Sequence, residues 1–331
     1  MLGKMDLSRI KIRLDNIRKK ATSSVSFEPS DVPIKFQEHY LSPTMSRLED
    51  KNSSYPLNPA ENGLMKQWNI YGYDESTQDY RALEGDIMFC SSSVIKLEDK
   101  YVFNLTVLPY FVTSMRKFEG KKDEEIRFTE NPTKERNKIL IKTKTESILE
   151  GAEPNSIVLI DGPLVGGMAS SYMIKMDNQL REKNCIPLYF VKNSDSRLLI
   201  DCDGQLSQEF NSDFHWAAHR LKQRSRSAFF KYTDRRNPRN SKVFTYLKAL
   251  AGFPERVEMH SLTYEKYVGL LPSLMNLIAY FYVAQGDVSN PQVRPVAIAE
   301  KFAREGLRIL NIPVLLWRLG FRPTINQVRF G

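Results

Sequence analysis

The sequence is poor in the residues that build thiol and imidazole sites. Its 331 residues include three cysteines and four histidines, and the cysteines form no Cys-x-x-Cys pair. An odd count without paired spacing argues against a disulfide scaffold or a thiolate zinc site and favours a reducing compartment. His215 and His219 have helical spacing, but Trp216 stands where a zinc hydrolase would have its glutamate base. These counts predict no zinc enzyme.

Three further features are missing. Gly166-Gly167 is not followed by Gly-Lys-Ser or Gly-Lys-Thr, so the chain lacks a phosphate-binding loop and we do not expect ATP binding. No charged segment leading into an apolar one resembles a secretory leader. The longest apolar stretch, residues 274–284, is too short to cross a bilayer. We therefore expect a cytoplasmic protein that is not held in a membrane.

Basic residues are abundant and unevenly placed. Lys and Arg number 48 against 39 Asp and Glu, a net charge of +9, and the 41% of hydrophobic residues is typical of a globular chain. From His219 to Lys248 there are ten Lys or Arg and a single acid, Asp234. A solvated basic face would explain this, but such concentration favours a nucleic-acid partner. The residues expected to contact DNA phosphates are Arg224, Arg226, Lys231, Arg235, Arg236 and Arg239. Phe229 and Phe230, in the same window, either stack on unpaired bases or belong to the core.

Two acidic residues each follow a run of strand-like residues. An unbroken aliphatic run over residues 157–160 leads into Asp161-Gly162, and residues 68–73 lead into Asp74 in a similar layout. Four aliphatic residues suit a buried strand and are too few for most helices. An Asp at a strand end either caps a turn or lies at the sheet edge where α/β proteins bind ligands. If the two strand ends are neighbours, the pair predicts a site for a divalent metal.

The order of the expected elements divides the chain in two. Residues 1–62 are expected to form an N-terminal amphipathic helix, over 6–20, followed by an extended connection. Residues 63–331 are expected to form one domain. Its elements are a strand ending at Asp74, hairpin strands over 87–96 and 101–108, a helix over 134–150, a strand ending at Asp161, and then alternating helices and strands. This is the order of a ribonuclease H-like (Piwi-like) α/β fold, a mixed sheet flanked by helices.

That topology places carboxylates at the ends of the first and fourth strands, on the first helix and on a late helix. Four residues fit these positions: Asp74, Glu146, Asp161 and Glu300. The first three are expected to be the metal ligands. Glu150 lies one turn beyond Glu146, and the pattern does not choose between them. Lys192, at the exit of a later strand, either contacts a phosphate or caps the sheet with its charge in solvent.

Several of these segments also resemble blocks of the NurA nucleases. The matching segments are Tyr71–Ser76, Val158–Leu164, Val191–Ser196 and Arg256–Glu258. The resemblance implies a metal-dependent DNA nuclease with a ribonuclease H-like core. It also implies a homodimer that works with the hexameric HerA translocase in DNA end processing.

The match to NurA has departures. Glu75 and Pro163 stand where the family has Gly and Ser. The late block, residues 293–300, keeps a proline and an alanine but puts Glu300 at the position of the family's Asp or His, and the family's tyrosine has no clear counterpart. Glu300 can still bind a hard metal through oxygen.

Cleavage of a phosphodiester needs an activated water and stabilisation of charge on the attacking and leaving oxygens. Two metal ions about 4 Å apart supply both, and Mg²⁺ or Mn²⁺ prefers carboxylate ligands. We therefore expect a DNA nuclease with two Mn²⁺ or Mg²⁺ ions whose catalytic residues are Asp74, Glu146, Asp161, Lys192 and Glu300. Two alternatives stay open: a DNA clamp or adaptor that has lost the site, and an RNA-directed enzyme of the same fold.

Overall fold

The computed structural model describes residues 40–42, 44–49, 54–60, 63–81, 86–97, 100–107, 110–112, 126–129, 131–165, 170–192, 194–235 and 237–318. The expected N-terminal helix, Gly166-Gly167 and Arg236 lie outside these ranges.

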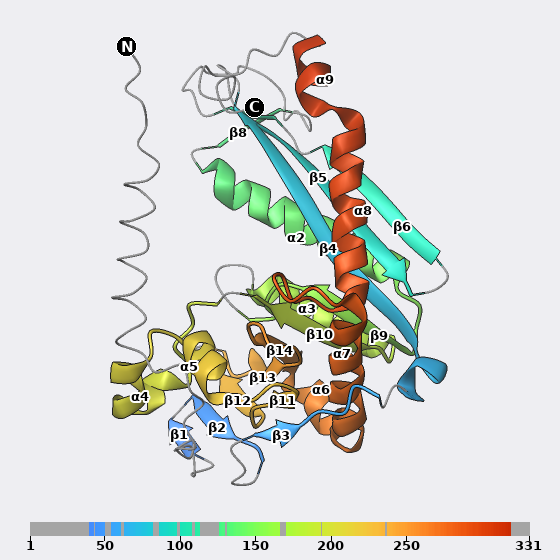
Figure 1. The fold of residues 1–331 in the computed structure, drawn as a ribbon. Helices are drawn as coiled ribbons and strands as arrows, with labels where there is room; N and C mark the ends of the chain where they lie inside the picture. Colours follow the sequence, from blue (N-terminus) through green and yellow to red (C-terminus); the bar gives the residue numbers. More distant parts are fainter. Residues whose placement is uncertain are drawn as a thin grey trace, which may run out of the picture.

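Within the described ranges, eight strands precede the first α-helix, and helices and further strands follow along the chain (Figure 1). The strands are β1 (Tyr40–Ser42), β2 (Met45–Arg47), β3 (Tyr55–Pro56), β4 (Asn69–Arg81), β5 (Asp86–Lys96), β6 (Lys100–Val107), β7 (Tyr110–Val112), β8 (Ile126–Phe128), β9 (Ser156–Asp161), β10 (Ile186–Val191), β11 (Ser225–Arg226), β12 (Phe230–Thr233), β13 (Ser241–Lys248) and β14 (Glu255–His260). The α-helices are α2 (Pro132–Gly151), α3 (Ser170–Glu182), α4 (Gly204–Glu209), α5 (Asp213–Arg220), α6 (Ser261–Lys266), α7 (Leu271–Gln285), α8 (Arg294–Leu310) and α9 (Ile312–Arg318).

One mixed sheet of 14 described strands organises the molecule. At its centre the order is β6, β5, β4, β9, β10, with β4, β5 and β6 antiparallel and β9 and β10 parallel to β4. The helix α2 separates the antiparallel strands from β9 in the chain, and α3 separates β9 from β10. This is the ribonuclease H-like topology, so the expected fold is confirmed. Beyond β10 the sheet continues through β14, β13 and β12, each antiparallel to its neighbour.

The segment expected to be an extended connection instead contributes strands to this sheet. β2 pairs with β12, β1 pairs with β2, and β3 pairs with β11. Without the N-terminal strands, β11 and β12 would each leave an edge of backbone N–H and C=O groups without partners. β3 and β2 supply those partners. The boundary expected between residues 62 and 63 therefore does not separate these strands from the sheet.

The two faces of the sheet are covered by different helices. Alternate side chains of β4 and β9, such as Tyr73 and Ile160, pack in a cluster with residues of α2 and α3. The intervening ones, such as Ile70 and Leu159, pack in a second cluster with α7 and the start of α8. Figure 1 shows α8 running along the long strands β4 and β5.

A close approach between α8 and β4 depends on Gly72. A Cβ at Gly72 would collide with the carbonyl group of Pro295, in the first turn of α8. The absence of a side chain therefore lets the helix backbone rest directly on the strand, two residues before Asp74.

One helical stretch of the described residues, Ser261–Gln285, is long and apolar enough to cross a membrane by length and composition. Much of its apolar surface is used inside the fold, because Leu274, Leu277, Ile278 and Phe281 are buried in the core cluster against the sheet. Packing on a sheet is a sufficient physical reason for this composition.

Candidate active site

Three of the predicted site residues lie on neighbouring strands of the sheet. The parallel register of β4 and β9 pairs Tyr73 with Ile160, so Asp74 and Asp161 follow side by side on adjacent strands. Asp161 is in turn paired with Phe190 of β10, and Lys192 lies two residues further on. Asp161 and Lys192 lie at the carboxyl ends of their strands, but the strand that was expected to end at Asp74 continues to Arg81, because β4 pairs with β5 over that whole length.

Strand alternation also points these three side chains to the same face. Asp74, Asp161 and Lys192 share the parity of Ile70, Leu159 and Phe190, which pack in the core cluster against α7 and α8. Asp74 is buried, with 5% of its surface exposed, whereas the side chain of Asp161 is 34% exposed and that of Lys192 is 26% exposed.

The charges of these groups act on one another. Burial raises the pKa of Asp74 from 3.8 to about 7, and the charges of Asp161 and Glu300 add to the shift. The backbone N–H of Glu75, which donates to Asp74 Oδ1 at 2.7 Å, and the charge of Lys192 oppose it. A carboxyl held back from ionisation beside a second carboxylate is a place where a cation is favoured.

Lys192 is a cation that forms an ion pair within this group of carboxylates. Its Nζ lies 3.2 Å from Asp161 Oδ1 in an ion pair. Burial lowers the pKa of Lys192, but the charges of Asp161, Glu255 and Asp74 outweigh burial, so the net shift is upward. Lys192 is therefore held as an ammonium inside the acid cluster and is not a snorkelling surface residue.

Glu300 comes from the helix that packs on this face of the sheet. It lies on α8, its side chain is 18% exposed, and its carboxylate pairs with Arg304 one turn later. Its charge helps to raise the pKa of Asp74. The structure thus brings Glu300 within electrostatic reach of Asp74, although an arginine already occupies one of its oxygens.

Glu146 does not belong to this group, and its expected role as a metal ligand is corrected here. It lies on α2, which packs on the opposite face of the sheet, and its side chain is 63% exposed with Lys142 3.7 Å away. The residues of α2 that face the sheet are Lys144, Ser147 and Ile148. Glu150 is exposed as well, so neither candidate joins Asp74 and Asp161.

The loop after Asp161 is anchored by a buried charge network that the sequence pattern did not indicate. Glu258 of β14 accepts a hydrogen bond from the backbone N–H of Leu164 at 3.0 Å, and Lys242 of β13 donates to the carbonyl of Val165 at 3.0 Å. Lys242 Nζ and Arg256 Nε lie 2.5 Å and 2.8 Å from Glu258 Oε1. Burial alone would raise the pKa of Glu258, but these two cations bring it below its usual value.

A second contact fixes Asp161 itself from the other face of the sheet. Lys144 of α2 donates to the backbone carbonyl of Asp161 at 2.8 Å and lies 5.0 Å from the centre of the Tyr73 ring. Lys144 thus fixes the backbone of Asp161, and the network around Glu258 fixes the loop that follows it.

Sequence reasoning missed one acid of the cluster, Glu255. It begins β14, which runs antiparallel to β10, so Glu255 lies next to Lys192 at the end of that strand. It is 2% exposed, and its carboxylate oxygens have no hydrogen-bond partner among the described residues. Burial raises its pKa well above the usual range, and Asp161 adds to the shift. An acid at the start of a strand gives no signal until the strand order is known.

Within the described residues, no group of three or more Asp, Glu, His or Cys side chains is arranged closely enough to hold a metal ion. The pair formed by Asp74 and Asp161 nevertheless suits a hard divalent cation in donor type and charge. Both offer carboxylate oxygens, and a cation would offset the burial and the repulsion that raise the pKa of Asp74.

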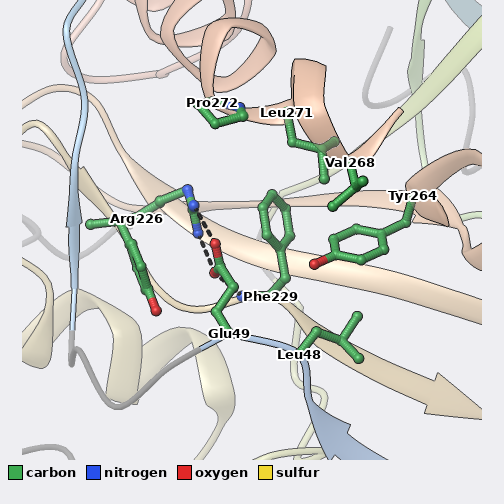
Figure 2. A pocket seen from close by; sticks show the side chains of 9 residues that line it. Leu48, Glu49, Arg226, Phe229, Tyr264, Val268, Leu271 and Pro272 are labelled. Atoms are coloured by element: carbon green, nitrogen blue, oxygen red, sulfur yellow. Dashed lines mark hydrogen bonds and ion pairs between the residues drawn. The ribbon is translucent and has the colours of Figure 1, made fainter. Parts of the chain in front are cut away.

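The basic window is divided between core and surface. Arg226 was expected to contact DNA, but it is 6% exposed and forms two bonds of 2.7 Å to the carboxylate of Glu49. Its guanidinium also lies over the rings of Tyr55, at 4.4 Å, and Phe229, at 4.3 Å. Figure 2 shows this ion pair in the wall of a cavity of about 380 Å³ that Tyr264 and Leu271 also line. Arg226 therefore fastens β11 to the N-terminal strands and is not available to a phosphate.

The other residues of the window differ in their availability. Arg224, Arg235 and Arg239 are exposed, and Lys231 is half-buried with Glu265 3.5 Å away. Arg236 lies outside the described residues. Phe229 and Phe230 are 1% and 2% exposed, so both belong to the core and neither can stack on a base.

Comparison with known proteins finds similarity at the level of structure. No protein-family model matches the chain, and no relative was found among curated proteins. The NurA nuclease from Sulfolobus solfataricus is 12% identical, with 96% of this chain and 98% of that chain covered and a TM-score of 0.49. A structure of NurA with manganese is 9% identical, with 92% and 98% covered and a TM-score of 0.43. Endonuclease V from Bacillus subtilis is 12% identical, with 78% and 86% covered and a TM-score of 0.37.

Proposed function

We propose that this protein is a metal-dependent deoxyribonuclease that hydrolyses phosphodiesters at single-stranded regions and DNA ends. The observation that carries the proposal is the position of Asp74 beside Asp161 on adjacent strands, with the pKa of Asp74 raised to about 7 by burial and by the charge of Asp161. A cation bound beside these carboxyl groups would favour their ionised forms. Lys192 alone cannot neutralise two carboxylates and a phosphate.

The residues of the cluster divide the work. Asp74 and Asp161 would hold Mn²⁺ or Mg²⁺, and Glu300 is the further acid whose charge reaches Asp74 and which could serve a second ion. When bound, such ions lower the pKa of water and neutralise charge on the phosphate. Lys192, whose Nζ lies 3.2 Å from Asp161 Oδ1, would bind a non-bridging oxygen of the same phosphate. Exposed Arg224, Arg235 and Arg239 would hold the strand through its phosphates.

The test is cleavage of end-labelled single-stranded and duplex DNA in Mn²⁺ by the native chain and by Asp74→Asn and Asp161→Asn. We expect the native chain to cleave and both variants to lose at least about 100-fold in rate, since each removes one ligand charge. Glu182→Gln, which removes an exposed carboxylate at the end of α3, is the matched control and should cleave normally. Equal cleavage by all four proteins would point to a contaminating nuclease and refute the proposal.

The proposed partners follow from the motif resemblance. We propose a homodimer in the cytoplasm that delivers DNA ends to its active sites with the help of a HerA-type hexameric ATPase. Co-purification of the two tagged proteins, with the mass of the complex measured by light scattering, tests this. A nuclease that stays monomeric and does not bind a HerA hexamer would refute the assembly and leave the cleavage proposal standing.

A second function is favoured by one observation. Within the described residues no three potential ligands are close enough to hold an ion, and Glu146 lies on the wrong face. Both features are expected of a DNA clamp or adaptor that kept the fold and lost the catalytic site. It predicts salt-sensitive DNA binding with no cleavage in Mn²⁺ or Mg²⁺ by the native chain, an outcome that excludes the nuclease.

A further inference from the structure

Helix α8 carries a row of basic residues beside the acid cluster. Lys301, Arg304 and Arg308 are all exposed, and the side chains of the two arginines are 69% and 79% exposed. The other side of the helix is buried on the sheet through residues such as Ala303 and Leu307. The helix therefore presents its cations to solvent, where an anionic partner can reach them.

These cations lie on the same side of α8 as Glu300. Glu300, Arg304 and Arg308 are four residues apart and form one row along the helix. Because a helix has about 3.6 residues per turn, Lys301 lies next to this row. Glu300 marks the end of the row at the acid cluster, since its charge acts on Asp74. The basic row therefore begins at the candidate active site.

From the acid cluster the row runs outward along β4 and β5. The first turn of α8 rests on Gly72, and Leu307 near its end packs in a cluster with Tyr80 and Phe89. The helix therefore follows β4 past Asp74, and Figure 1 shows it beside the two long strands. Each step of four residues advances about 6 Å along the helix, which is comparable with the distance between neighbouring phosphates of an extended nucleic-acid strand.

The cations expected from the basic window are not all close to the acid cluster. Arg235 and Arg239 belong to the turn between β12 and β13, and the Nε2 of His260, at the end of β14, lies 3.2 Å from the carbonyl oxygen of Arg239. Lys192 lies beside the opposite end of β14, at Glu255. A strand of this length spans roughly 17 Å. Phosphates next to the acid cluster therefore need nearer cations than these two arginines.

The ion pairs along the row leave it open to phosphate. Arg304 pairs with Glu300, and Arg308 pairs with Glu305. Pairs of this kind on an exposed helix surface are weak, so a phosphate can replace the carboxylate. A guanidinium group also has several N–H donors, and one carboxylate does not use them all. The carboxylates therefore do not block the row.

We infer that Lys301, Arg304 and Arg308 bind successive phosphates of the DNA strand whose scissile phosphate lies at the acid cluster. The strand leaves the cluster along α8, with its backbone toward the helix. The inference rests on the proposed action on DNA and adds the surface that holds the substrate next to the reacting phosphodiester. Since these contacts are made to phosphates, binding depends strongly on salt and carries no preference among bases.

The test measures binding without cleavage. Fluorescence anisotropy in EDTA gives the affinity of the whole protein for labelled (dT)12 at several salt concentrations. The triple variant Lys301→Gln, Arg304→Gln, Arg308→Gln should bind at least about tenfold more weakly at physiological salt. Its plot of log affinity against log salt should be shallower by about 2, because each phosphate contact on a single strand contributes about 0.7. Arg304→Lys combined with Arg308→Lys keeps both charges and should keep the native slope.

Helix α2 offers a matched control. Lys134, Lys138 and Lys142 are exposed and have four-residue spacing, and Lys138 and Lys142 form ion pairs within the helix. However, α2 covers the other face of the sheet. Changing these three lysines to Gln removes the same charge from the protein. This control should keep the native affinity and salt dependence.

An unchanged salt slope in the α8 triple variant would overturn the inference. An equal loss in the α2 control would do so as well, because net charge alone would then explain the effect. So would dissociation of a dimer of the α8 variant in light scattering, since the row would then join two copies of the chain. If the triple variant does not fold, Arg308→Gln alone should make the slope shallower by about 0.7. Native protein that binds no DNA would refute the nuclease and the row together, whereas native binding that the α8 variant retains would refute the row alone.

Discussion

The free energy of unfolding should depend on pH through Asp74, and Asp74→Asn should remove this dependence. The pKa of Asp74 is 3.8 in the reference state and about 7 in the fold. Below pH 4 the group is protonated in both states and contributes nothing. Between pH 4 and pH 7 the unfolded chain releases the proton that the folded chain keeps, so stability falls as pH rises. Above pH 7 the loss is complete.

The size of the effect follows from the shift. About three pKa units correspond to about 4 kcal/mol of destabilisation at pH 8, in the absence of metal. Because neighbouring charges share the repulsion, we expect at least about half of this amount, ~2 kcal/mol. Asn keeps the shape of Asp74 and the oxygen that accepts from the N–H of Glu75, and it carries no charge.

Urea unfolding followed by circular dichroism, in EDTA from pH 4.5 to pH 8.5, measures this directly. The difference between Asp74→Asn and the native chain should grow by ~2 to 4 kcal/mol across that range. Glu182→Gln, on the surface of α3, should follow the native curve. Saturating Mn²⁺ at pH 8 should raise the stability of the native chain and reduce the advantage of Asp74→Asn. Parallel pH profiles for the native chain and Asp74→Asn would refute the electrostatic account of the site.

Three further variants test other parts of the structure. Glu258→Gln leaves two buried cations without their carboxylate and should cost about 3 to 5 kcal/mol in urea unfolding, whereas an unchanged midpoint would mean that the network does not hold the loop after Asp161. Gly72→Ala should cost about 1 to 3 kcal/mol, because the new methyl group meets the backbone of α8, and full retention of the melting temperature would contradict that contact. Arg226→Ala should lower the free energy of unfolding by about 3 kcal/mol and leave DNA affinity unchanged. Arg239→Ala should leave the free energy of unfolding unchanged and lower DNA affinity a few-fold, with a shallower salt dependence. The reverse pattern in DNA titrations would show that Arg226 contacts DNA.

Much of the secondary structure was predictable from local patterns. The strand expected to end at Asp161 is β9, and the helix expected over 134–150 is the body of α2. Further along the chain, α4 and α5 are two short helices with a break between them. There the side chain of Ser212 accepts from the N–H of His215 and starts a new helix. A cap of this kind is local, but whether it is used depends on how the two short helices pack.

Apolar runs leading into an acid drew attention to Asp74 and Asp161, which lie side by side on β4 and β9, but only the second run ends its strand, since β4 continues to Arg81. The order of the elements was sufficient for the ribonuclease H-like fold. Which acids share a cluster depended on the face of the sheet that each helix covers, and this is set by packing between residues far apart in the chain. That packing put α2 and Glu146 on one face of the sheet, and Asp74, Asp161 and Glu300 on the other face. It also brought Glu255 beside Lys192 through an antiparallel pairing that local sequence does not encode.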